Sequence, residues 1–428
     1  MKESAAGSAL HVVVIGSGVA GTAAGIAAAS ISRSVVLLDG GSGASTLATG
    51  ALDHAFWQDH RIDTPARPLS DAAKTVLNAM AGYVVPAEGC RVVTMAGLVR
   101  RADGRDRALL DVGSLGSGRV GVVASHRPGW NARELASAWG EGYAPLEATL
   151  LRYTDERSLP DADLAARHDD EERLDWLAAR LRLALAQAGT TWSGIVLPPM
   201  LGLVRAQAEG LSRSVGLPCG EAVGSPGGPA GIRFESGRDR ALSLAGVAKV
   251  ASRASIVEAC GESWRITTED GQILDAHSVV VATGGLIGGG IEYAPSEAVL
   301  ATAHPSHVRP PLRLTLKAPL TLGTHGRALE TPGSLFGFAP ERLAPPFARD
   351  SLVERAGVLV ARPELGALHE GNPRGLFAAG DLVADTPRTW LAALSQGAHA
   401  GAQAARSALS RAEAANGAKA AATSATPL

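Results

Sequence analysis

Two short apolar runs near the start of the chain are separated by a segment of small residues. Residues 10–15, LHVVVI, are rich in β-branched residues, and residues 34–39, SVVLLD, form the second run. Between them lie GSGVAG and TAAGIAAASIS, whose small side chains favour a helix. The pattern predicts a strand, a glycine turn, a helix and a second strand. Such a unit is typical of a doubly wound α/β sheet, in which ligands bind beyond the carboxyl ends of the strands.

A second alternation of strands and helices begins at residue 119. It predicts strands at 119–124, 146–153 and 193–199, and helices at 131–141, within 161–188 and at 202–214. The longest helical segment carries leucines on one face, at positions 174, 177, 181 and 185. This stripe indicates a helix facing the core rather than a partner, with Gly189 as its C-terminal cap. The preceding region, 61–118, is less regular and contains one predicted helix at 70–82.

The C-terminal half combines a strand-rich part with an irregular one. A Gly/Pro loop at 217–233 and a helix near 235–248 lead into strands at 255–260, 263–273 and 276–285, with a turn at Asp270-Gly271. Residues 288–350 are rich in proline and carry several His and Arg residues, as in a substrate-facing cap. A further strand, a glycine junction and a helix from about 386 to 409 follow. The remaining segment is of low complexity, and we expect it to be frayed.

These elements predict a doubly wound, Rossmann-type α/β fold that is discontinuous in sequence. Its parts are residues 1–60, 250–290 and 355–410. A smaller α/β domain is inserted at 61–249, a loop-rich substrate or cap region occupies 291–354, and 411–428 is expected to be a flexible tail.

Composition excludes several classes of partner. Of the 428 residues 46% are hydrophobic, and 40 basic residues nearly balance 42 acidic ones, so no overall field favours nucleic acid or an anionic membrane. The longest apolar stretch is far shorter than the roughly 20 residues that span a bilayer, and no signal peptide is evident. We therefore expect a cytoplasmic protein that meets a membrane only through a partner.

The three cysteines suggest neither a disulfide framework nor a metal site. Cys90, Cys219 and Cys260 are far apart and show no C-x-x-C spacing, which argues against zinc and iron–sulfur ligation within this chain. No metal is expected.

The glycine turn has the spacing of a dinucleotide site. Gly16, Gly18 and Gly21 form G-x-G-x-x-G, which provides a tight turn, close approach of a pyrophosphate and close helix packing. Asp39 ends the next strand, where an acid binds the ribose 2′-hydroxyl. The acid favours FAD or NAD over NADP, and an adenine dinucleotide such as FAD over FMN. The alternative is a tight turn that holds no ligand.

Two later junctions between a strand and glycines favour FAD over NAD. They are VVVATGG at 279–285 and GLFAAGD at 375–381, and a single-sheet NAD domain needs neither. In large flavoproteins the second junction brings a carboxylate, here Asp381, to the ribityl chain. Thr386-Pro387 predicts an N-cap with proline at the first helical position. The positive end of that helix would stabilise negative charge on a reduced flavin. As the alternative, Asp381 is a turn or capping residue.

Four segments, in this order, resemble the flavoprotein oxidoreductases that include succinate dehydrogenase and fumarate reductase flavoprotein subunits. They are VVVIGSGVAG, STLATGALD, VVVATGG and GLFAAGD. Within that group the chain is more similar to the B-type subunits of anaerobic glycerol-3-phosphate dehydrogenase, on the Ser-x-x-x-x-Gly-x-Leu-Asp run from Ser45 to Asp53. The resemblance implies a subunit that oxidises sn-glycerol 3-phosphate to dihydroxyacetone phosphate and passes electrons toward quinone. It also implies flavoprotein and iron–sulfur partner subunits and a peripheral position at the inner face of the cell membrane.

Two other functions stay open. One is a self-sufficient FAD-dependent dehydrogenase or reductase of the succinate/fumarate type that acts on a small acid. The other is a subunit that binds FAD without catalysis and serves as a scaffold.

The resemblance also bears on the glycine-rich stretch at 40–53, which could otherwise be a slack linker. In this superfamily the chain at that point runs beneath the flavin ring, so Ser45, Thr46, Thr49 and Gly50 are predicted to touch flavin. The whole predicted cofactor set is Gly16, Ser17, Gly18, Ala20, Gly21, Asp39, Gly40, Ser45, Thr46, Thr49, Gly50, Thr283, Gly284, Gly380, Asp381, Thr389, Trp390 and Leu391.

Candidate catalytic residues follow from the chemistry of hydride loss. A hydroxyl-bearing carbon that gives up hydride needs a base for its hydroxyl proton, and histidine titrates in the suitable range. His54 adjoins the glycine loop and borders the substrate side with Asp53, while His304 or His307 lies near Arg309 and Arg313, which could clamp a phosphate or carboxylate. For each histidine a surface or structural role stays open.

Overall fold

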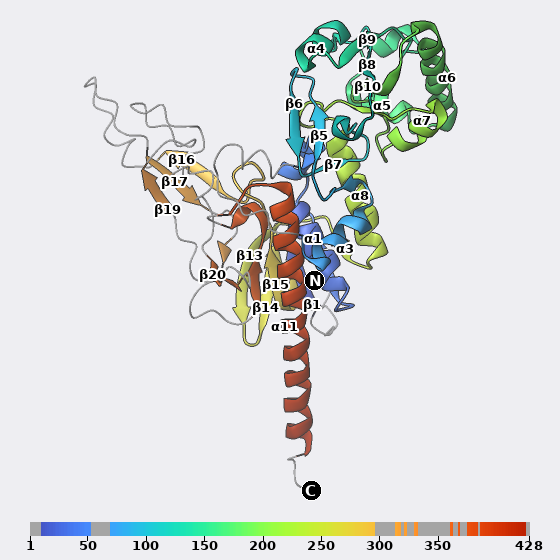
Figure 1. Cartoon of the computed structure of the whole chain (residues 1–428). Helices are drawn as coiled ribbons and strands as arrows, with labels where there is room; N and C mark the ends of the chain where they lie inside the picture. Colours follow the sequence, from blue (N-terminus) through green and yellow to red (C-terminus); the bar gives the residue numbers. More distant parts are fainter. Residues whose placement is uncertain are drawn as a thin grey trace, which may run out of the picture. The chain divides into compact units, whose positions relative to one another are not determined.

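The structure is a computed structural model that forms two compact units (Figure 1). It describes residues 10–52, 69–295, 313–317, 321–322, 329–332, 360–362, 367–368, 375–383 and 386–424. Unit 1 comprises Met1–Ala44, His60–Val76 and Ala241–Leu428, and unit 2 comprises Ser45–Asp59 and Leu77–Arg240. The four-part division drawn from the sequence stays a prediction, because most of the region 291–354 lies outside the described residues.

Unit 1 is built on a parallel sheet. Its parallel strands are β1 (Leu10–Ile15), β2 (Val35–Leu38), β12 (Ala248–Val250), β15 (Ile273–Val281) and β22 (Leu376–Ala378). They lie in the order β12-β2-β1-β15-β22, and each pairs in parallel with its neighbours. Val12, Val13 and Val14 of the central strand are fully buried. The predicted doubly wound, Rossmann-type α/β fold is confirmed.

An antiparallel extension continues the sheet from β15. β13 (Ala254–Cys260) pairs with β14 (Ser263–Thr268), which pairs with the first half of β15. The turn before β15 contains Asp270, whose carboxylate accepts from the hydroxyls of Ser252 and Thr268 at 2.7 and 2.5 Å. Gly271 follows at a φ of +81°. The predicted meander and its Asp270-Gly271 turn are therefore confirmed.

Shorter strands complete the described part of unit 1. β18 (Thr321–Leu322) pairs with β13, and β21 (Ala367–Leu368) joins β20 (Val360–Arg362) to β22. A separate antiparallel sheet holds β16 (Glu292–Pro295), β17 (Arg313–Lys317) and β19 (Leu329–Pro332).

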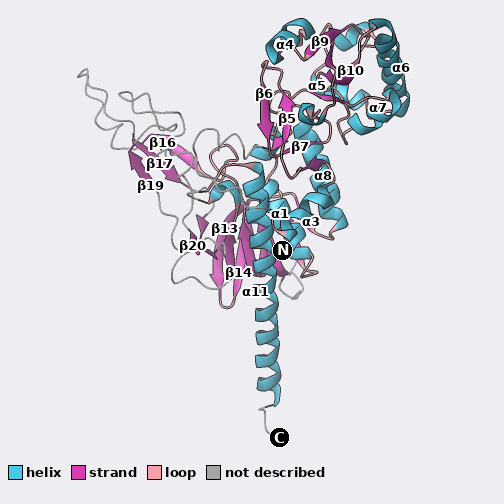
Figure 2. Cartoon of the chain, in the orientation of Figure 1, coloured by secondary structure: helices cyan, strands magenta, loops and turns pink. Residues whose placement is uncertain are grey.

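Two helices of unit 1 pack backbone to backbone. They are α1 (Val19–Ala29) and α11 (Trp390–Ser424), which lie side by side (Figure 2). A Cβ on Gly397 or Gly401 of α11 would overlap the main-chain carbonyls of Ala20 and Ala24, so both glycines are required by the close approach. The expectation that this helix ends near residue 409 is wrong. The alanine-rich segment that follows has high helix propensity, and the helix continues through Ser424.

Unit 2 contains a second parallel sheet. Its strands are β8 (Arg119–Val123), β9 (Tyr143–Leu146), β10 (Trp192–Leu197) and β11 (Cys219–Glu221), in the order β9-β8-β10-β11. The strand predicted at 146–153 is wrong. The observed strand, β9, ends at Leu146, where the predicted strand begins. The ladder ends at the pair Val123 and Leu146, where β8 itself ends, so the described sheet offers no β8 residue to pair with the residues beyond.

Unit 2 also contains α-helices. They are α4 (Ala132–Trp139), α5 (Asp161–Arg167), α6 (Glu171–Ala188), α7 (Ala208–Val215) and α8 (Pro229–Leu244, which continues into unit 1). The long helix expected within 161–188 is two helices, because the Asp170 carboxylate accepts from the amide of Arg173 and starts α6. Gly189 ends α6 in the left-handed conformation, as predicted. α8 begins earlier than predicted, at a proline suited to a first turn.

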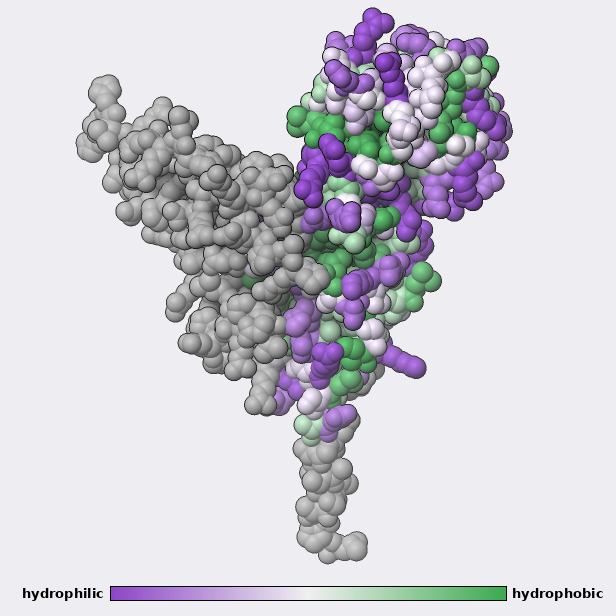
Figure 3. All heavy atoms as spheres, viewed as in Figure 1, coloured by the Kyte–Doolittle hydropathy of each residue, from purple (hydrophilic) through white to green (hydrophobic). Residues whose placement is uncertain are grey.

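Smaller elements occur elsewhere in the described chain. They are the 3₁₀ turns η1 (Ala44–Leu47), η2 (Val112–Ser114) and η3 (Thr154–Arg157), α3 (Asp71–Met80), the three-stranded sheet of β3 (Ala51–Leu52), β7 (Gly104–Asp106) and β4 (Tyr83–Val84), and the hairpin of β5 (Cys90–Val93) and β6 (Val99–Ala102). On the face shown in Figure 3, hydrophilic and hydrophobic side chains are interspersed over the described surface. Within the described ranges, no helix is both long enough and apolar enough to span a bilayer.

A buried polar cluster joins α5 and α6 in unit 2. The fully buried Glu156 side chain pairs with Arg173 at 2.7 Å and with Arg167 at 3.0 Å. His168 lies between the two helices, fully buried, and its Nδ1 lies 2.8 Å from the carbonyl oxygen of Leu164. Burial lowers the pKa of His168 to about 4.

We expect acid to destabilise unit 2 through His168. The unfolded imidazole takes up a proton near pH 6.5 but the folded one only near pH 4, so stability is lost as the pH falls through this window, by up to about 3 kcal/mol. Thermal unfolding of the wild type and a His168→Gln variant from pH 7.5 to pH 4 measures this. The variant should lose part of the pH dependence, whereas His126→Gln, at an exposed position, should keep it. Equal slopes in all three proteins would contradict the assignment.

Candidate functional site

The carboxyl ends of four neighbouring strands meet at one edge of the unit 1 sheet. Ile15 of β1 lies opposite both Leu38 of β2 and Val281 of β15, and Val281 lies opposite Ala378 of β22. The residues that follow these ends are Gly16, Asp39, Thr283, Gly284, Gly380 and Asp381. Segments far apart in the sequence are thus brought to one edge, where parallel α/β sheets bind ligands.

The turn after β1 leaves no room for side chains. Gly16 has a φ of +108°, and a Cβ there would overlap the carbonyl oxygen of Ala282. A Cβ on Gly21 would in turn overlap the carbonyl oxygen of Gly16. The first and third glycines of the motif are therefore required by the packing of this turn itself.

Gly18, the middle glycine of the motif, is not explained by its backbone conformation. It is the N-cap of α1, with a φ of −66° and a ψ of −175°, which other residues also adopt. Having no side chain, it cannot cap the helix as Ser or Asp would. Bare backbone at a helix N-terminus suits an anion, because first-turn amides and the helix dipole both favour negative charge.

Asp39 lies against this turn. Its Oδ1 accepts from the Ser17 hydroxyl at 2.6 Å and from the Gly41 amide at 3.0 Å, and Oδ2 lies 3.3 Å from Lys249 Nζ. These contacts hold the carboxylate, which keeps acceptor capacity for a further hydroxyl. A Cβ on the neighbouring Gly40 would lie only 2.7 Å from Arg253 Cγ. Lys249 and Arg253 are site neighbours that sequence reasoning missed, since no local pattern connects β12 to β2.

The glycine junction after β22 packs against α1, the helix that follows the turn after β1. The junction after β15 lies next to that turn. Gly380 has a φ of +76°, and a Cβ there would lie 2.7 Å from the Cβ of Ala20 in α1. Its amide donates to Gln396 Oε1 of α11 at 2.9 Å, a partner the sequence did not suggest. Gly284 also has a positive φ, +86°. The partly buried Asp381 has its pKa raised by burial, against the opposing effect of the positive charge of Arg388.

The start of α11 differs from the prediction. The helix begins at Trp390, and Thr389 Oγ1 accepts from the amide of Ala392 at 3.2 Å. Thr386 is not the N-cap, because its hydroxyl donates to the carbonyl of Val383 at 2.9 Å and holds the preceding turn instead. Leu391 is buried in the core with 2% exposure. The cofactor contacts of Thr389, Trp390 and Leu391 stay predictions.

The loop from Ser45 to Gly50 belongs to unit 2 and is held by hydrogen bonds and packing there. Gly50 has a φ of +91°, and its carbonyl accepts from the Asp106 amide at 2.7 Å. A Cβ on Gly231 of α8 would overlap the carbonyl of Thr46. This part of the glycine-rich stretch is therefore not a slack linker. The flavin contacts of Ser45, Thr46, Thr49 and Gly50 stay predictions.

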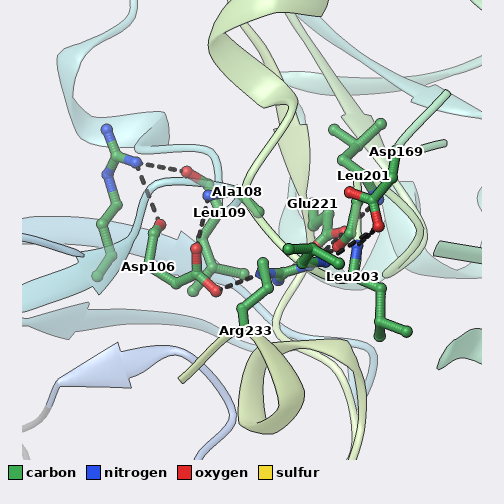
Figure 4. Close-up of polar contacts among 11 residues, drawn as sticks. Asp106, Ala108, Leu109, Asp169, Leu201, Leu203, Glu221 and Arg233 are labelled. Atoms are coloured by element: carbon green, nitrogen blue, oxygen red, sulfur yellow. Dashed lines mark hydrogen bonds and ion pairs between the residues drawn. The ribbon is translucent and has the colours of Figure 1, made fainter. Parts of the chain in front are cut away.

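Asp106, whose amide donates to the carbonyl of Gly50, is part of a buried ion network (Figure 4). Arg233 donates from Nε to Asp106 and from Nη2 to Glu221, both at 2.7 Å, and from Nη1 to the Gly202 carbonyl at 2.6 Å. Asp106 also accepts from the Ala108 amide at 2.9 Å. Burial raises the pKa of Glu221, and the Arg233 guanidinium opposes that rise. The network joins β7, β11 and α8 and fixes the backbone that holds Gly50.

The predicted catalytic side chains are not among those that the structure describes. His54, His304 and Arg309 lie outside the described residues, as do Asp53 and His307, and Arg313 begins β17 with its side chain undescribed. Their roles stay predictions. Across the described ranges, no group of three or more His, Cys, Asp or Glu side chains is arranged to hold a metal ion.

Comparison with protein families shows which cofactor the chain binds. Residues 11–119 match the FAD binding domain family. The chain binds FAD. The match begins in β1 and takes in the glycine turn, α1, β2 and Asp39. That the turn binds the pyrophosphate and Asp39 the adenosine ribose stays a prediction.

Solved structures similar to this chain are distant. A flavocytochrome c3 fumarate reductase is 12% identical, with 94% of this chain and 78% of that chain covered and a TM-score of 0.34. A thioredoxin reductase from Gloeobacter violaceus is also 12% identical, with 94% and 96% covered and a TM-score of 0.31. A peptidyl tryptophan dihydroxylase, QhpG, is 13% identical, with a TM-score of 0.24; 65% of this chain matches only 33% of that protein. A search of curated proteins found no match.

Replacing Asp39 by Ala should weaken FAD retention. Loss of charge-assisted hydrogen bonds of about 1.5–3 kcal/mol corresponds to about tenfold to hundredfold weaker binding. Titration of the flavin-free protein with FAD, followed by flavin fluorescence, measures the change. Lys249→Met and Ser17→Ala are matched controls, because each removes one protein partner of Asp39 and leaves the carboxylate. If either control loses as much affinity as Asp39→Ala, the acid acts through that partner rather than on the ribose.

Replacing Asp381 by Asn should stabilise the flavin-free protein. The gain in stability over the wild type should grow as the pH rises. Burial raises the pKa of Asp381, so the folded state is penalised as the carboxyl ionises between its ordinary pKa, about 4, and the raised value. Unfolding midpoints of variant and wild type should therefore diverge as the pH rises from 4 to 8. The exposed Asp163→Asn variant is the control. A difference that does not vary with pH would refute the role of burial.

Proposed function

We propose that the chain is an FAD-dependent oxidoreductase. The observation that carries the proposal is the convergence of the Gly16 turn, Asp39 and the Gly380-Asp381 junction on the carboxyl ends of adjacent strands. The turn and the N-terminus of α1 would hold the pyrophosphate, Asp39 the adenosine ribose and Asp381 the ribityl chain. The start of α11, capped by Thr389, would direct its positive end at the flavin ring.

The proposed reaction is oxidation of a hydroxyl-bearing carbon. Bound FAD supplies the acceptor for two electrons and the hydrogen carried with them. The protein must take the hydroxyl proton and hold the substrate. His54 or His304 is proposed as the base, and Arg309 with Arg313 as the clamp for an anionic group of the substrate.

For the substrate we propose sn-glycerol 3-phosphate, with the chain as one component of a dehydrogenase complex. The support is the run from Ser45 to Asp53, which resembles the B-type subunits of the anaerobic glycerol-3-phosphate dehydrogenase family. The wide spacing of Cys90, Cys219 and Cys260 supports a separate iron–sulfur subunit for onward electron transfer toward quinone. We propose a cytoplasmic complex that reaches the inner face of the membrane through that partner.

Anaerobic reduction of the bound flavin tests the proposal. sn-Glycerol 3-phosphate, its enantiomer and succinate are added in turn to the purified FAD-loaded chain, alone and with co-purifying subunits. Selective bleaching of the visible flavin absorption by sn-glycerol 3-phosphate is expected, because the arginine clamp and the base together favour one enantiomer. Reduction by succinate instead would favour a self-sufficient enzyme for small acids. Bleaching by none of them, with partners present, would indicate a scaffold and overturn the dehydrogenase proposal.

A further inference from the structure

Unit 2 contains a cavity of about 510 Å³ that is separate from the residues described above for FAD. One wall is α7 with the segment from Leu217 to Cys219, and the other is the segment from Arg105 to Leu115. Since Cys219 begins β11, the cavity lies at the amino end of that strand. A cavity of this size accommodates a small organic ligand.

Three arginines line this cavity. Arg105 extends from β7, Arg107 follows it, and Arg213 extends from α7. Arg105 Nη1 donates to the carbonyl of Leu109 at 2.7 Å, and Arg107 Nε donates to the carbonyl of Ala81 at 3.1 Å. Among the described residues, none of the three arginines forms an ion pair with a carboxylate.

Arg105 has a buried donor without a partner. Its Nε is inaccessible to solvent and makes no hydrogen bond within the described chain. This nitrogen is therefore closed to a ligand as well, and Arg105 acts on a ligand in the cavity through the positive charge of its guanidinium. Arg213 is exposed and forms no hydrogen bond or ion pair with the described residues, so it is available to a ligand.

The acidic side chains of the lining do not neutralise these arginines. Asp111 Oδ1 accepts from the amides of Arg91 and Gly113, at 3.1 and 3.0 Å, and caps η2. Glu209 is exposed on α7, one turn before Arg213, and among the described residues it forms no ion pair with Arg213. With three cationic and two anionic side chains, the lining keeps a net positive charge.

The rest of the lining is largely apolar. Leu109 and Leu110 are 2% and 5% exposed and form a fixed wall with Leu115 and Leu217. Arginines beside leucines suit a ligand with one anionic group and an apolar body, because the body removes apolar surface from water while the anion meets the guanidiniums.

We propose that this cavity binds a small organic anion with an apolar body, which carries a carboxylate or a phosphate ester. The site is assigned to Arg105, Arg107 and Arg213 for the charge and to the leucines for the body. It does not depend on the proposed FAD chemistry, since no predicted cofactor or catalytic residue lines it.

Calorimetric titration of the FAD-loaded full chain tests the site with four probes. Benzoate and phenyl phosphate carry both features, inorganic phosphate carries only charge, and benzyl alcohol carries only the apolar body. We expect saturable binding of benzoate or phenyl phosphate with a Kd on the order of 1 mM or tighter, and at least about fivefold weaker binding of the other two. Whether benzoate or phenyl phosphate binds more tightly shows whether the natural ligand carries a carboxylate or a phosphate.

The test variant is the double substitution Arg107→Met and Arg213→Met. It removes two exposed charges but keeps Arg105, whose bond to Leu109 has a structural role. Affinity for the tighter probe should fall at least about fivefold, as expected for two exposed charge contacts. Arg133→Met, at an exposed position of α4 outside the cavity, should bind as the wild type does. Absence of saturable binding by both two-feature probes, or equal affinity in the double variant and the wild type, would overturn the proposal.

Discussion

The contact between the glycine turn after β1 and the end of β15 fixes the edge of the unit 1 sheet at which its parallel strands end. The Gly16 amide donates to the carbonyl of Leu38 at 2.9 Å, and the Ala282 amide donates to the carbonyl of Ile15 at 2.8 Å. These bonds extend the strand ladders one residue beyond the strands, so three strand ends are locked in register. The packing leaves no space for a Cβ on Gly16, and bare backbone is therefore a condition of the edge itself.

The same absence of side chains sets the position of α11 in unit 1. Gly397 and Gly401 let α11 approach the backbone of α1 at Ala20 and Ala24, which places Gln396 on the amide of Gly380. A bulkier residue at either glycine would separate the two helices and move the junction after β22 away from the turn after β1. The packing of α1 against α11 therefore also sets the geometry of the glycine junctions at the edge of the unit 1 sheet.

In unit 2 a buried network of ion pairs, rather than close backbone packing, orders the chain. Arg233, with its side chain 5% exposed, pairs with Asp106 and Glu221, which are 2% and 1% exposed. Two carboxylates around one guanidinium leave an excess negative charge in a dry environment, and the amides that donate to both acids offset part of that cost. The result is an ordered backbone at Gly50, where composition alone would also allow a slack linker.

Local patterns in the sequence determined the doubly wound core, the meander at Asp270-Gly271 and the cap at Gly189, because strand alternation, helical stripes and glycine conformations act over a few residues. The glycine spacing with Asp39 likewise predicted FAD as the cofactor, which the family match confirms. Only the tertiary structure decided that Asp170 divides the long helix, that β9 ends at Leu146 and that Thr389 rather than Thr386 caps α11. Each of these depends on which partner a distant segment offers to a backbone amide, carbonyl or side-chain oxygen. The same holds for Lys249, Gln396 and the arginine-lined cavity, since a sequence does not show which side chains the fold brings together.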